Sequence, residues 1–350
     1  MPLLALLRPL ARCLPPIRVL HAFFLPAALR PTALLPACLL PVCLLFASAP
    51  AHAQDFPVRP VRLITPYAAG GGIDLLARAV AQGLSQVWNQ QVIVDNRPGA
   101  GSTIGNAAVA KAAPDGYTLL VSANAMAIGP VAYRTLPYDL KRDFAAISLV
   151  ASTPEVLTVA PGLGVGQVSD LIARARGRTM NYGSAGKGTL AHLAAESFNR
   201  RAQLASVHVP YKGSNPALID LISGQIDWLF DSPAALIQHI QSGKLRALAV
   251  ASARRTAQLP EVPTLAEAGF PGLEFLIWMG LMAPASTPQP VLDHIERTLA
   301  EVLRGPATRK SLGDQGWDIA EQGSKHFASF FEREIERLGE AARNAGMSPE

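Results

Sequence analysis

The sequence predicts an α/β protein with two lobes, and three observations support this prediction. Two glycine-rich turns, at residues 65–74 and 181–189, each follow a strand-like run and open a helix-like run. Short apolar runs alternate with helical patterns along the chain, which is typical of βαβ units around largely parallel sheets. Two extended apolar runs, 147–159 and 275–283, each follow one block of alternating elements and precede another.

We interpret the extended apolar runs as two crossover strands between the lobes. Residues 54–155 plus 275–350 would then form lobe 1, and residues 156–274 would form lobe 2. Ligands of open α/β sheets bind at the carboxyl ends of the strands. The first glycine-rich turn and a third glycine-rich connection, 99–105, are therefore expected to face the second turn across an interlobe cleft.

Helical periodicity and turn residues define the elements of lobe 1. Leu76, Val80 and Leu84 recur at helical spacing after the first turn, which predicts a helix over 75–86. The other elements expected in this lobe are a strand at 91–94, a helix at 103–112, a strand at 117–121 and helices at 288–304 and 324–345.

Helix start and stop signals divide lobe 2. Asn215-Pro216 has the pattern of an N-cap followed by proline at the first helical position, and Gly224 would end that helix. Ser232-Pro233 predicts a second helix start and Gly243 its end. The strands expected around these helices lie at 226–230 and 245–251. This β-α-β-α-β order predicts a largely parallel sheet with right-handed crossovers.

Residues 1–53 are predicted to be an export signal. They carry four arginines and no acidic residue, an apolar stretch over 33–46, and small residues that end in Ala51-His52-Ala53. A basic region, an apolar region and an A-x-A ending describe a cleavable signal peptide, with cleavage between Ala53 and Gln54. The apolar stretch is shorter than the roughly 20 residues of a membrane span and is interrupted by prolines, which disfavours a membrane anchor.

Removal of this segment changes what the composition implies. The mature chain has 350 − 53 = 297 residues, and its formal charge is (31 − 4) − 26 = +1 instead of +5. A nearly neutral chain without a basic run interleaved with aromatics gives no indication of nucleic-acid binding. Cys13, Cys38 and Cys43 all lie in the removed segment, which excludes disulfides and thiolate metal ligands from the mature protein. We expect no cofactor and no metal.

The two glycine-rich turns have the features of anion sites. The first turn of a helix leaves backbone N–H groups without intrahelical partners, and the helix dipole adds positive potential there. Glycine lets this backbone approach a ligand closely because it has no Cβ. Two such turns could hold both ends of a dianion, or one carboxylate from two sides.

Neither turn matches a nucleotide-binding or hydrolase motif. Gly70-Gly71-Gly72 lacks the G-x-G-x-x-G spacing of dinucleotide-binding turns. Gly188 follows Lys187 where a P-loop needs serine or threonine. Tyr182 stands where a G-x-S-x-G nucleophile elbow around Ser184 would need glycine.

Asp74 and His192 each have a structural and a ligand-binding interpretation. Asp74 is placed to cap the helix that follows the first turn, a more common role for a carboxylate there than catalysis. His192 precedes Glu196 by four residues on a helix, which is usually a surface or capping pair. No second histidine completes an H-E-x-x-H zinc motif. Contact with a ligand stays open for both side chains.

Six dispersed segments resemble one protein family, in the same order as in its members. The segments are PYAAGGGID at 66–74, DNRPGAGSTIG at 95–105, PDGYTL at 114–119, NYGSAGKGTLAH at 181–192, VPYKG at 209–213 and LPEVPTLAEAG at 259–269. They resemble the tripartite tricarboxylate transporter receptors, also called the Bug family, over residues 54–345. One departure is Ala68, where many members have proline.

The resemblance implies a two-lobed periplasmic binding protein of type II, the Venus-flytrap fold, that closes on its ligand. It implies a periplasmic, non-enzymatic and monomeric receptor that captures a small carboxylate (a di- or tricarboxylate, an amino acid or an aromatic acid). The receptor would deliver this ligand to the integral-membrane permease subunits of a tripartite tricarboxylate transporter. Family ligands are held by backbone amides and bound water from loops that match 67–72 and 184–189 here.

The expected ligand-binding residues combine both turns with side chains that would set selectivity. An acidic Asp231 beside the ligand would favour an amino or hydroxyl group over a second carboxylate. The full set is Tyr67, Ala68, Ala69, Gly70, Gly71, Asp74, Thr103, Asn124, Ser184, Ala185, Gly186, Gly188, Thr189, His192, Tyr211 and Asp231.

Two other functions remain open at this point. One is a sensor subunit that presents its ligand to a membrane kinase, which would bind in the same way. The other is a secreted hydrolase of small esters or amides that uses Ser184 and His192, although no orienting acid for such a pair is evident.

Overall fold

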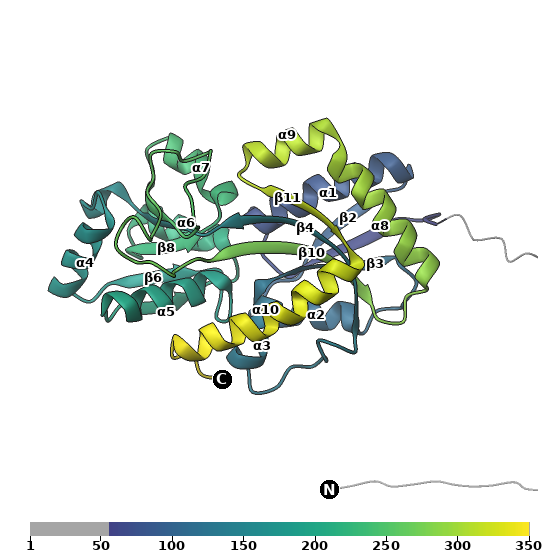
Figure 1. Cartoon of the computed structure of the whole chain (residues 1–350), viewed down its shortest axis with the longest axis horizontal. Coiled ribbons are helices and arrows are strands. Elements are labelled where there is room, and N and C mark those ends of the chain that lie inside the picture. The colour runs from purple at the N-terminus through teal and green to yellow at the C-terminus, as the bar shows by residue number, and fades with distance from the viewer. Residues whose placement is uncertain (1–55, 350) are drawn as a thin grey trace, which may run out of the picture. The chain divides into compact units, whose positions relative to one another are not determined.

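The computed structural model describes residues 56–349, and the predicted export signal lies outside this range. Two β-sheets flanked by helices organise the described chain (Figure 1). We call residues 56–154 and 276–349 the sheet A region, and residues 156–275 the sheet B region.

Sheet A has six strands in the order β11-β4-β10-β3-β1-β2. Its strands are β1 (Val61–Thr65), β2 (Val92–Asn96), β3 (Thr118–Ala123), β4 (Phe144–Pro154), β10 (Leu276–Pro284) and β11 (Asp318–Gly323). β1 pairs in parallel with β2 and β3, whereas β10 is antiparallel to both β3 and β4. The late strand β10 thus joins the parallel N-terminal strands to β4 and β11.

Sheet B has five strands in the order β7-β6-β8-β5-β9. Its strands are β5 (Val156–Val159), β6 (Asn181–Ser184), β7 (Val207–Pro210), β8 (Trp228–Asp231) and β9 (Arg246–Val250). β6 is parallel to β7 and β8, but β5 lies between β8 and β9 and is antiparallel to both. β6, β7, β8 and β9 therefore run in one direction, which confirms the predicted largely parallel sheet, whereas the insertion of β5 between β8 and β9 was not predicted.

The two apolar runs predicted as crossover strands behave differently from each other. The first is divided at Glu155, where β4 of sheet A ends and β5 of sheet B begins. The second is almost entirely β10 of sheet A, and only Phe275 precedes it. Backbone bonds tie the two crossings together, because Glu155 N donates to Phe275 O (2.9 Å) and Ala251 N donates to Glu155 O (2.8 Å).

Most predicted helices occur within a few residues of their expected ends. The sheet A region carries α1 (Gly72–Trp88), α2 (Thr103–Ala110), α3 (Asn124–Ala132), α8 (Gln289–Arg304), α9 (Pro306–Asp314) and α10 (Ser324–Asn344). The sheet B region carries the 3₁₀ turn η1 (Pro161–Leu163), α4 (Val168–Gly177), α5 (Leu190–Ala202), α6 (Ser214–Ser223) and α7 (Pro233–Gln241). The N-cap of α6 is Gly213 instead of the predicted Asn215, and Gly224 ends that helix in the left-handed conformation.

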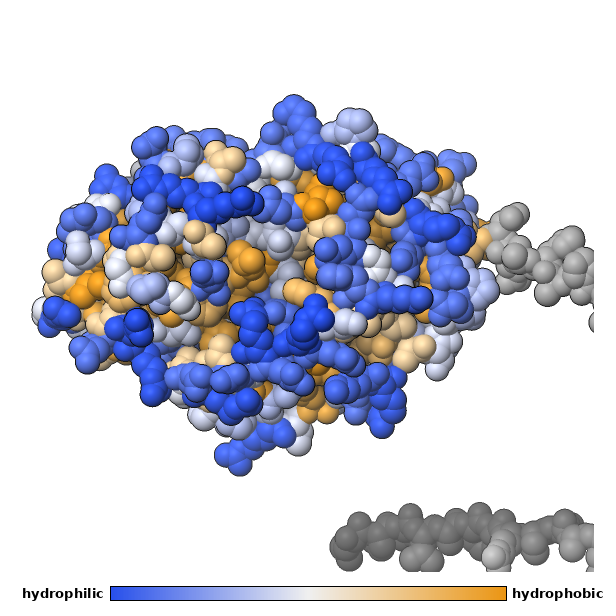
Figure 2. Space-filling view, viewed as in Figure 1, coloured by the Kyte–Doolittle hydropathy of each residue, from blue (hydrophilic) through white to orange (hydrophobic). Residues whose placement is uncertain are grey.

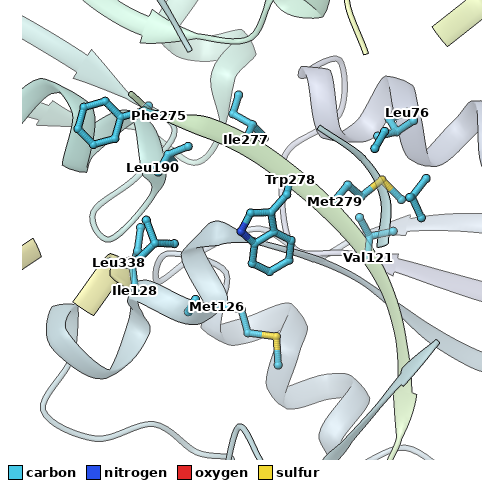
Figure 3. Packing of buried hydrophobic residues seen from close by; sticks show 14 of the residues in the cluster. Leu76, Val121, Met126, Ile128, Leu190, Phe275, Ile277, Trp278, Met279 and Leu338 are labelled. Atoms are coloured by element: carbon cyan, nitrogen blue, oxygen red, sulfur yellow. The ribbon is translucent and has the colours of Figure 1, made fainter. Parts of the chain in front are cut away.

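Two apolar clusters fill the space between the sheets and their helices, a large one with residues from both sheet regions and a smaller one in the sheet B region. Strand β10 packs apolar side chains on both faces of sheet A. Figure 3 shows Met279 directed toward Leu76 and Val121, and Trp278 directed to the opposite side of the strand. Trp278 is 2 % exposed, and its indole N–H donates to Glu334 (2.9 Å). This tryptophan is a core residue, as expected for the second apolar run.

The surface shown in Figure 2 is largely polar, and blue residues follow α10 across the front of the molecule. This helix is amphipathic, since Phe327, Phe331 and Leu338 are buried on its inner side. Within residues 56–349, no helix is both long enough and apolar enough to cross a membrane.

Candidate functional site

One cavity between the sheet A and sheet B regions is lined by the N-termini of five helices. Each of these helices follows directly on a strand, so the cavity lies at the carboxyl ends of parallel strands, where α/β proteins bind ligands. The lining residues at the helix starts are Gly71 and Gly72 of α1, Asn124 of α3, Thr189 and Leu190 of α5, Ser214 of α6, and Ser232 beside α7.

The helix starts present backbone donors toward this space. The first intrahelical bond of α1 runs from Leu75 N to Gly71 O, and that of α5 from Leu193 N to Thr189 O. The amides that precede these bonds have no intrahelical acceptor, and five helix dipoles add positive potential. The cavity is therefore suited to an anionic group.

Within residues 56–349, no lysine, arginine or histidine lines this cavity. Lys187 and Lys212 instead line a neighbouring pocket that shares Tyr67 and Ala185 with it. Attraction for an anion in the cavity comes from backbone dipoles, which recognise a carboxylate by hydrogen-bond geometry without a formal counter-charge.

Glycines allow the two sheet regions to approach closely. A Cβ on Gly72 of α1 would lie 2.1 Å from Ser232 Oγ in the sheet B region. A Cβ on Gly213 would lie 2.6 Å from the Ala68 Cβ in the first turn. The third glycine-rich connection also reaches the second turn, because a Cβ on Gly101 would lie 2.3 Å from Lys187 O. The turns therefore contact one another across the junction.

Asp74 is a buried and fully paired carboxylate at the start of α1. It is 1 % exposed, and its oxygens accept bonds from Gly70 N (2.9 Å), Arg78 Nε (2.8 Å) and Asn96 Nδ2 (2.8 Å). Burial alone would raise the pKa of Asp74, but these donors and the charge of Arg78 lower it overall. Asp74 does not line the cavity. The structure supports its structural interpretation, in which it holds the first turn against α1 and β2.

Among the described residues, Glu155 and Asp231 are the two acidic side chains that line the cavity. Glu155 is 2 % exposed and its Oε2 has no hydrogen-bond partner in the described chain. Burial and the charge of Asp231 raise the pKa of Glu155 well above its usual value. Asp231 ends β8 and accepts a bond from Ser232 N (2.7 Å). Burial raises its pKa to about 6 despite bonds from Ser214 and Ser232.

A stack of aromatic rings packs beside the second glycine-rich turn, at residues 181–189. His192 stacks on His208 with ring centroids 4.0 Å apart, and His208 stacks on Tyr182 at 4.9 Å. His192 Nδ1 accepts a bond from Gly188 N (3.3 Å). Burial, together with the neighbouring His208 and Lys187, lowers the pKa of His192 to about 3, so the ring is neutral and its 3.8 Å contact with Glu196 is not an ion pair.

Ser184 pairs with a histidine other than the one considered from the sequence. Its hydroxyl lies 2.7 Å from His208 Nε2 and also bonds Gly186 O (3.1 Å), whereas His192 serves the loop backbone. Ser184 is 1 % exposed and lines neither the cavity nor the neighbouring pocket. A Ser184–His192 nucleophile is therefore not assembled, because the chain places these side chains on the loop and the ring stack.

Asn124 and Tyr211 make contacts within the protein instead of offering free polar groups. The Asn124 amide donates to Leu276 O (3.1 Å) and accepts from Trp278 N (3.0 Å), which fixes α3 to β10 at the cavity wall. The Tyr211 hydroxyl donates to Asp220 (2.5 Å), and burial and Asp220 raise its pKa to about 12. Tyr211 lines the neighbouring pocket instead of the cavity.

The predicted ligand-binding residues divide into three groups. Those that line the cavity are Tyr67, Ala68, Gly71, Asn124, Ala185, Thr189 and Asp231. Those that line only the neighbouring pocket are Gly186 and Tyr211. Those that line neither space are Ala69, Gly70, Asp74, Thr103, Ser184, Gly188 and His192.

Sequence reasoning missed several lining residues, including Glu155, Ser214, Ser232, Ile277 and Trp317. One signal for Glu155 is present in the sequence, because it is the single charged residue in the run 147–159. Trp317 gave no local signal, since it reaches the cavity only through the packing of the C-terminal segment. Its buried Nε1 also lacks a partner in the described chain. No group of three or more potential metal-ligating side chains occurs within residues 56–349.

Comparisons with known proteins place the chain among solute receptors. It is 38 % identical over 285 residues to a UPF0065 protein from the tcbD-tcbE intergenic region of Pseudomonas sp. strain P51, covering 81 % of this chain and 85 % of the relative. It is 36 % identical over 303 residues to protein BugT of Bordetella pertussis, covering 85 % and 93 %.

Solved structures share the fold. The periplasmic binding protein BugD matches with a TM-score of 0.82 and 30 % identity, over 84 % of this chain and 100 % of that one. Rpa4515 of R. palustris with adipate matches with a TM-score of 0.82 and 34 % identity, over 84 % and 100 %. MatC of Rhodopseudomonas palustris with bound malate matches with a TM-score of 0.77 and 30 % identity, over 82 % and 99 %.

The fold is that of a periplasmic binding protein, as the resemblance implied. A family model described as tripartite tricarboxylate transporter family receptor matches residues 76–347, which is most of the described chain. The chain belongs to the tripartite tricarboxylate transporter receptor family.

Proposed function

We propose that this protein is a periplasmic receptor that binds a small carboxylate between its sheet A and sheet B regions. The observation that carries this proposal is the convergence of five helix N-termini on one cavity whose described lining contains no cationic side chain. Desolvating a carboxylate is unfavourable unless its oxygens find donors, and the helix starts supply them. The adipate and malate in two related structures agree with a carboxylate ligand.

The two regions would act as lobes that close on the ligand. Residues 54–155 and 275–350 would move as one lobe and residues 156–274 as the other, with the junction at Glu155, Ala251 and Phe275 as the hinge. The close approach at these glycines would belong to the closed arrangement of the lobes. We further propose that the closed receptor delivers its ligand to the membrane subunits of a tripartite tricarboxylate-type permease, after export and cleavage near Ala53–Gln54.

Binding without catalysis fits the side chains at the site. Ser184, whose hydroxyl pairs with His208, is buried under the second turn and does not line the cavity. We expect no turnover of small esters, and we expect Ser184→Ala to leave any background rate unchanged.

The proposal is tested by thermal unfolding of the purified protein with a panel of small carboxylates. A ligand at 100 times its Kd adds about 2.7 kcal/mol to stability, which for a chain of this size raises Tm by roughly 5–10 °C. A Tm shift with one class of carboxylate supports the receptor. A folded, ligand-free protein that responds to none of them contradicts it, once mass spectrometry has excluded a carboxylate retained from the cell.

Closure is tested with Gly72→Ala, which puts a methyl group against Ser232. The closed arrangement cannot accept this methyl group without a shift of Ser232, so we expect ligand affinity at least roughly tenfold weaker. Opening of the lobes would relieve the overlap in the ligand-free protein. Gly129→Ala in α3 is the matched control, because its Cβ would meet only Leu136 at 3.5 Å, an ordinary contact. Equal affinities for the two variants would refute closure at this junction.

A further inference from the structure

The cavity combines an anion-binding wall with an acidic wall. Glu155 is held at the junction of β4 and β5 by backbone bonds on both sides, to Phe275 O and from Ala251 N. Its neighbour in sequence, Val156, pairs with Asp231 across β5 and β8. Both carboxyl groups line the same cavity, and both belong to backbone that is fixed by sheet hydrogen bonds.

Within residues 56–349, one oxygen of this acidic pair has no hydrogen-bond partner. Glu155 Oε2 is buried without a partner in the described chain, and Glu155 is 2 % exposed. Asp231 receives bonds only from Ser232 and Ser214 among the described residues. A buried carboxylate normally has a cation or several donors, and an unpaired one costs several kcal/mol. Such a group in a binding cavity indicates that a ligand supplies the partner.

The other titratable group that faces Glu155 is Tyr67 of the first turn. Burial and the charge of Glu155 raise the pKa of Tyr67, although a hydrogen bond with the Ala125 backbone lowers it. The Tyr67 hydroxyl therefore stays neutral. No lysine, arginine or histidine in the described part of the chain lines the cavity to neutralise the pair. The missing charge must come from a proton or from the ligand.

We propose that the ligand is a small amino carboxylate, whose carboxylate lies at the helix N-termini and whose ammonium group lies against Glu155 and Asp231. This rests on the proposed receptor function and names the ligand class for the same cavity. The ammonium group would donate a charge-assisted hydrogen bond to Glu155 Oε2. A neutral hydroxyl in the same place would donate a weaker one. A second carboxylate in this position would face like charges.

The pH dependence of binding separates these ligand classes. The raised pKa values of Glu155 and Asp231 mean that the empty pair holds protons at acidic pH. An ammonium group must displace them, so affinity for an amino carboxylate rises as pH rises through about 6. A dicarboxylate would need protonated acids as donors, so its affinity would rise as pH falls.

The test is isothermal titration calorimetry of the purified protein at pH 5.5 and pH 7.5. The probes are short α- and ω-amino acids, each paired with analogues that carry hydrogen, hydroxyl or carboxylate in place of the ammonium group. We expect the best amino acid to bind roughly 10- to 100-fold more tightly than its analogues at pH 7.5, with affinity lower at pH 5.5.

Glu155→Gln and Asp231→Asn are expected to remove this preference while the desamino acid still binds. Glu340→Gln, an exposed change on α10, is the control and should behave as the wild type. Circular dichroism and Tm establish that each variant is folded.

Tighter binding of a diacid or hydroxy acid than of its amino partner, or an unchanged preference in both cavity variants, would overturn the amino-carboxylate assignment and leave the receptor function standing. Failure of a folded, ligand-free protein to bind any probe would overturn the receptor function and the assignment together.

Discussion

Two places near the first glycine-rich turn bury carboxylates, and they treat them in opposite ways. At the start of α1, Asp74 has three donors and a lowered pKa. At the junction of the sheets, Glu155 has an oxygen without a partner among residues 56–349, and both it and Asp231 have raised pKa values. A buried carboxylate thus has all its hydrogen-bond partners at Asp74, and it lacks one within residues 56–349 at Glu155.

This difference separates a buried carboxylate whose partners come from the fold from one whose partner we expect to come from the ligand. The fold supplies Asp74 with partners that are close along the chain or on the next strand, namely Gly70, Arg78 and Asn96. It supplies Glu155 with an apolar strand environment and a second acid. Folding is thus favoured by the first carboxylate and opposed by the second, whose partner arrives with the ligand.

The largest expected effect in this comparison is the loss of Asp74. Asp74→Asn keeps the side-chain volume but leaves Arg78 without its ion pair and places an amide N–H₂ against other donors. We expect a loss of about 2–4 kcal/mol in the free energy of unfolding, measured by urea denaturation. An effect within about 0.5 kcal/mol would contradict the structural role given to this network.

His192 gives the next effect, and it depends on pH. Its folded-state pKa of about 3 lies below the unfolded value of 6.5, so the unfolded chain takes up the proton first. Its contribution to stability is full above pH 6.5 and is lost as pH falls toward 3. We expect His192→Gln to remove up to about 3 kcal/mol of the destabilisation between pH 6.5 and 4. Parallel pH–stability curves for variant and wild type would show that the ring is not held neutral.

Glu155→Gln should change the free energy of unfolding by a smaller amount, and it should stabilise the protein where Asp74→Asn destabilises it. The folded chain holds a proton on Glu155 at pH values where the unfolded chain has lost it. Its contribution to stability is therefore present below pH 4.5 and is lost as pH rises above that value. Without ligand, the variant should be more stable than wild type by roughly 1–2 kcal/mol at pH 8, with a difference that shrinks at pH 5. A less stable variant at pH 8 would mean that the protein does satisfy this carboxylate.

Local signals explain what the sequence could predict. Glycine turns, Ser232-Pro233 and Gly224 mark helix ends through nearby backbone chemistry, and the helical faces follow from spacing. The insertion of β5 between β8 and β9 was missed because pairing between distant strands leaves no local trace. Helix α3 was missed because Gly129 and Pro130 interrupt its pattern.

The site was predicted in part for the same reason. Backbone features at Gly71 and Thr189 were visible as motifs, and both residues line the cavity. Glu155 and Trp317 reach it only through tertiary packing. His192 lies close to the second turn in the sequence, but in the structure it stacks on His208 of the neighbouring strand β7 and accepts a bond from Gly188 N, which gives it a structural role.

The most direct test of this account is a crystal structure of the protein with its tightest-binding amino carboxylate. We predict the ligand carboxylate at the amides that begin α1 and α5, and its ammonium group between Glu155 and Asp231. A ligand carboxylate bound instead beside Lys187 and Lys212 in the neighbouring pocket would contradict recognition by helix N-termini without a cation.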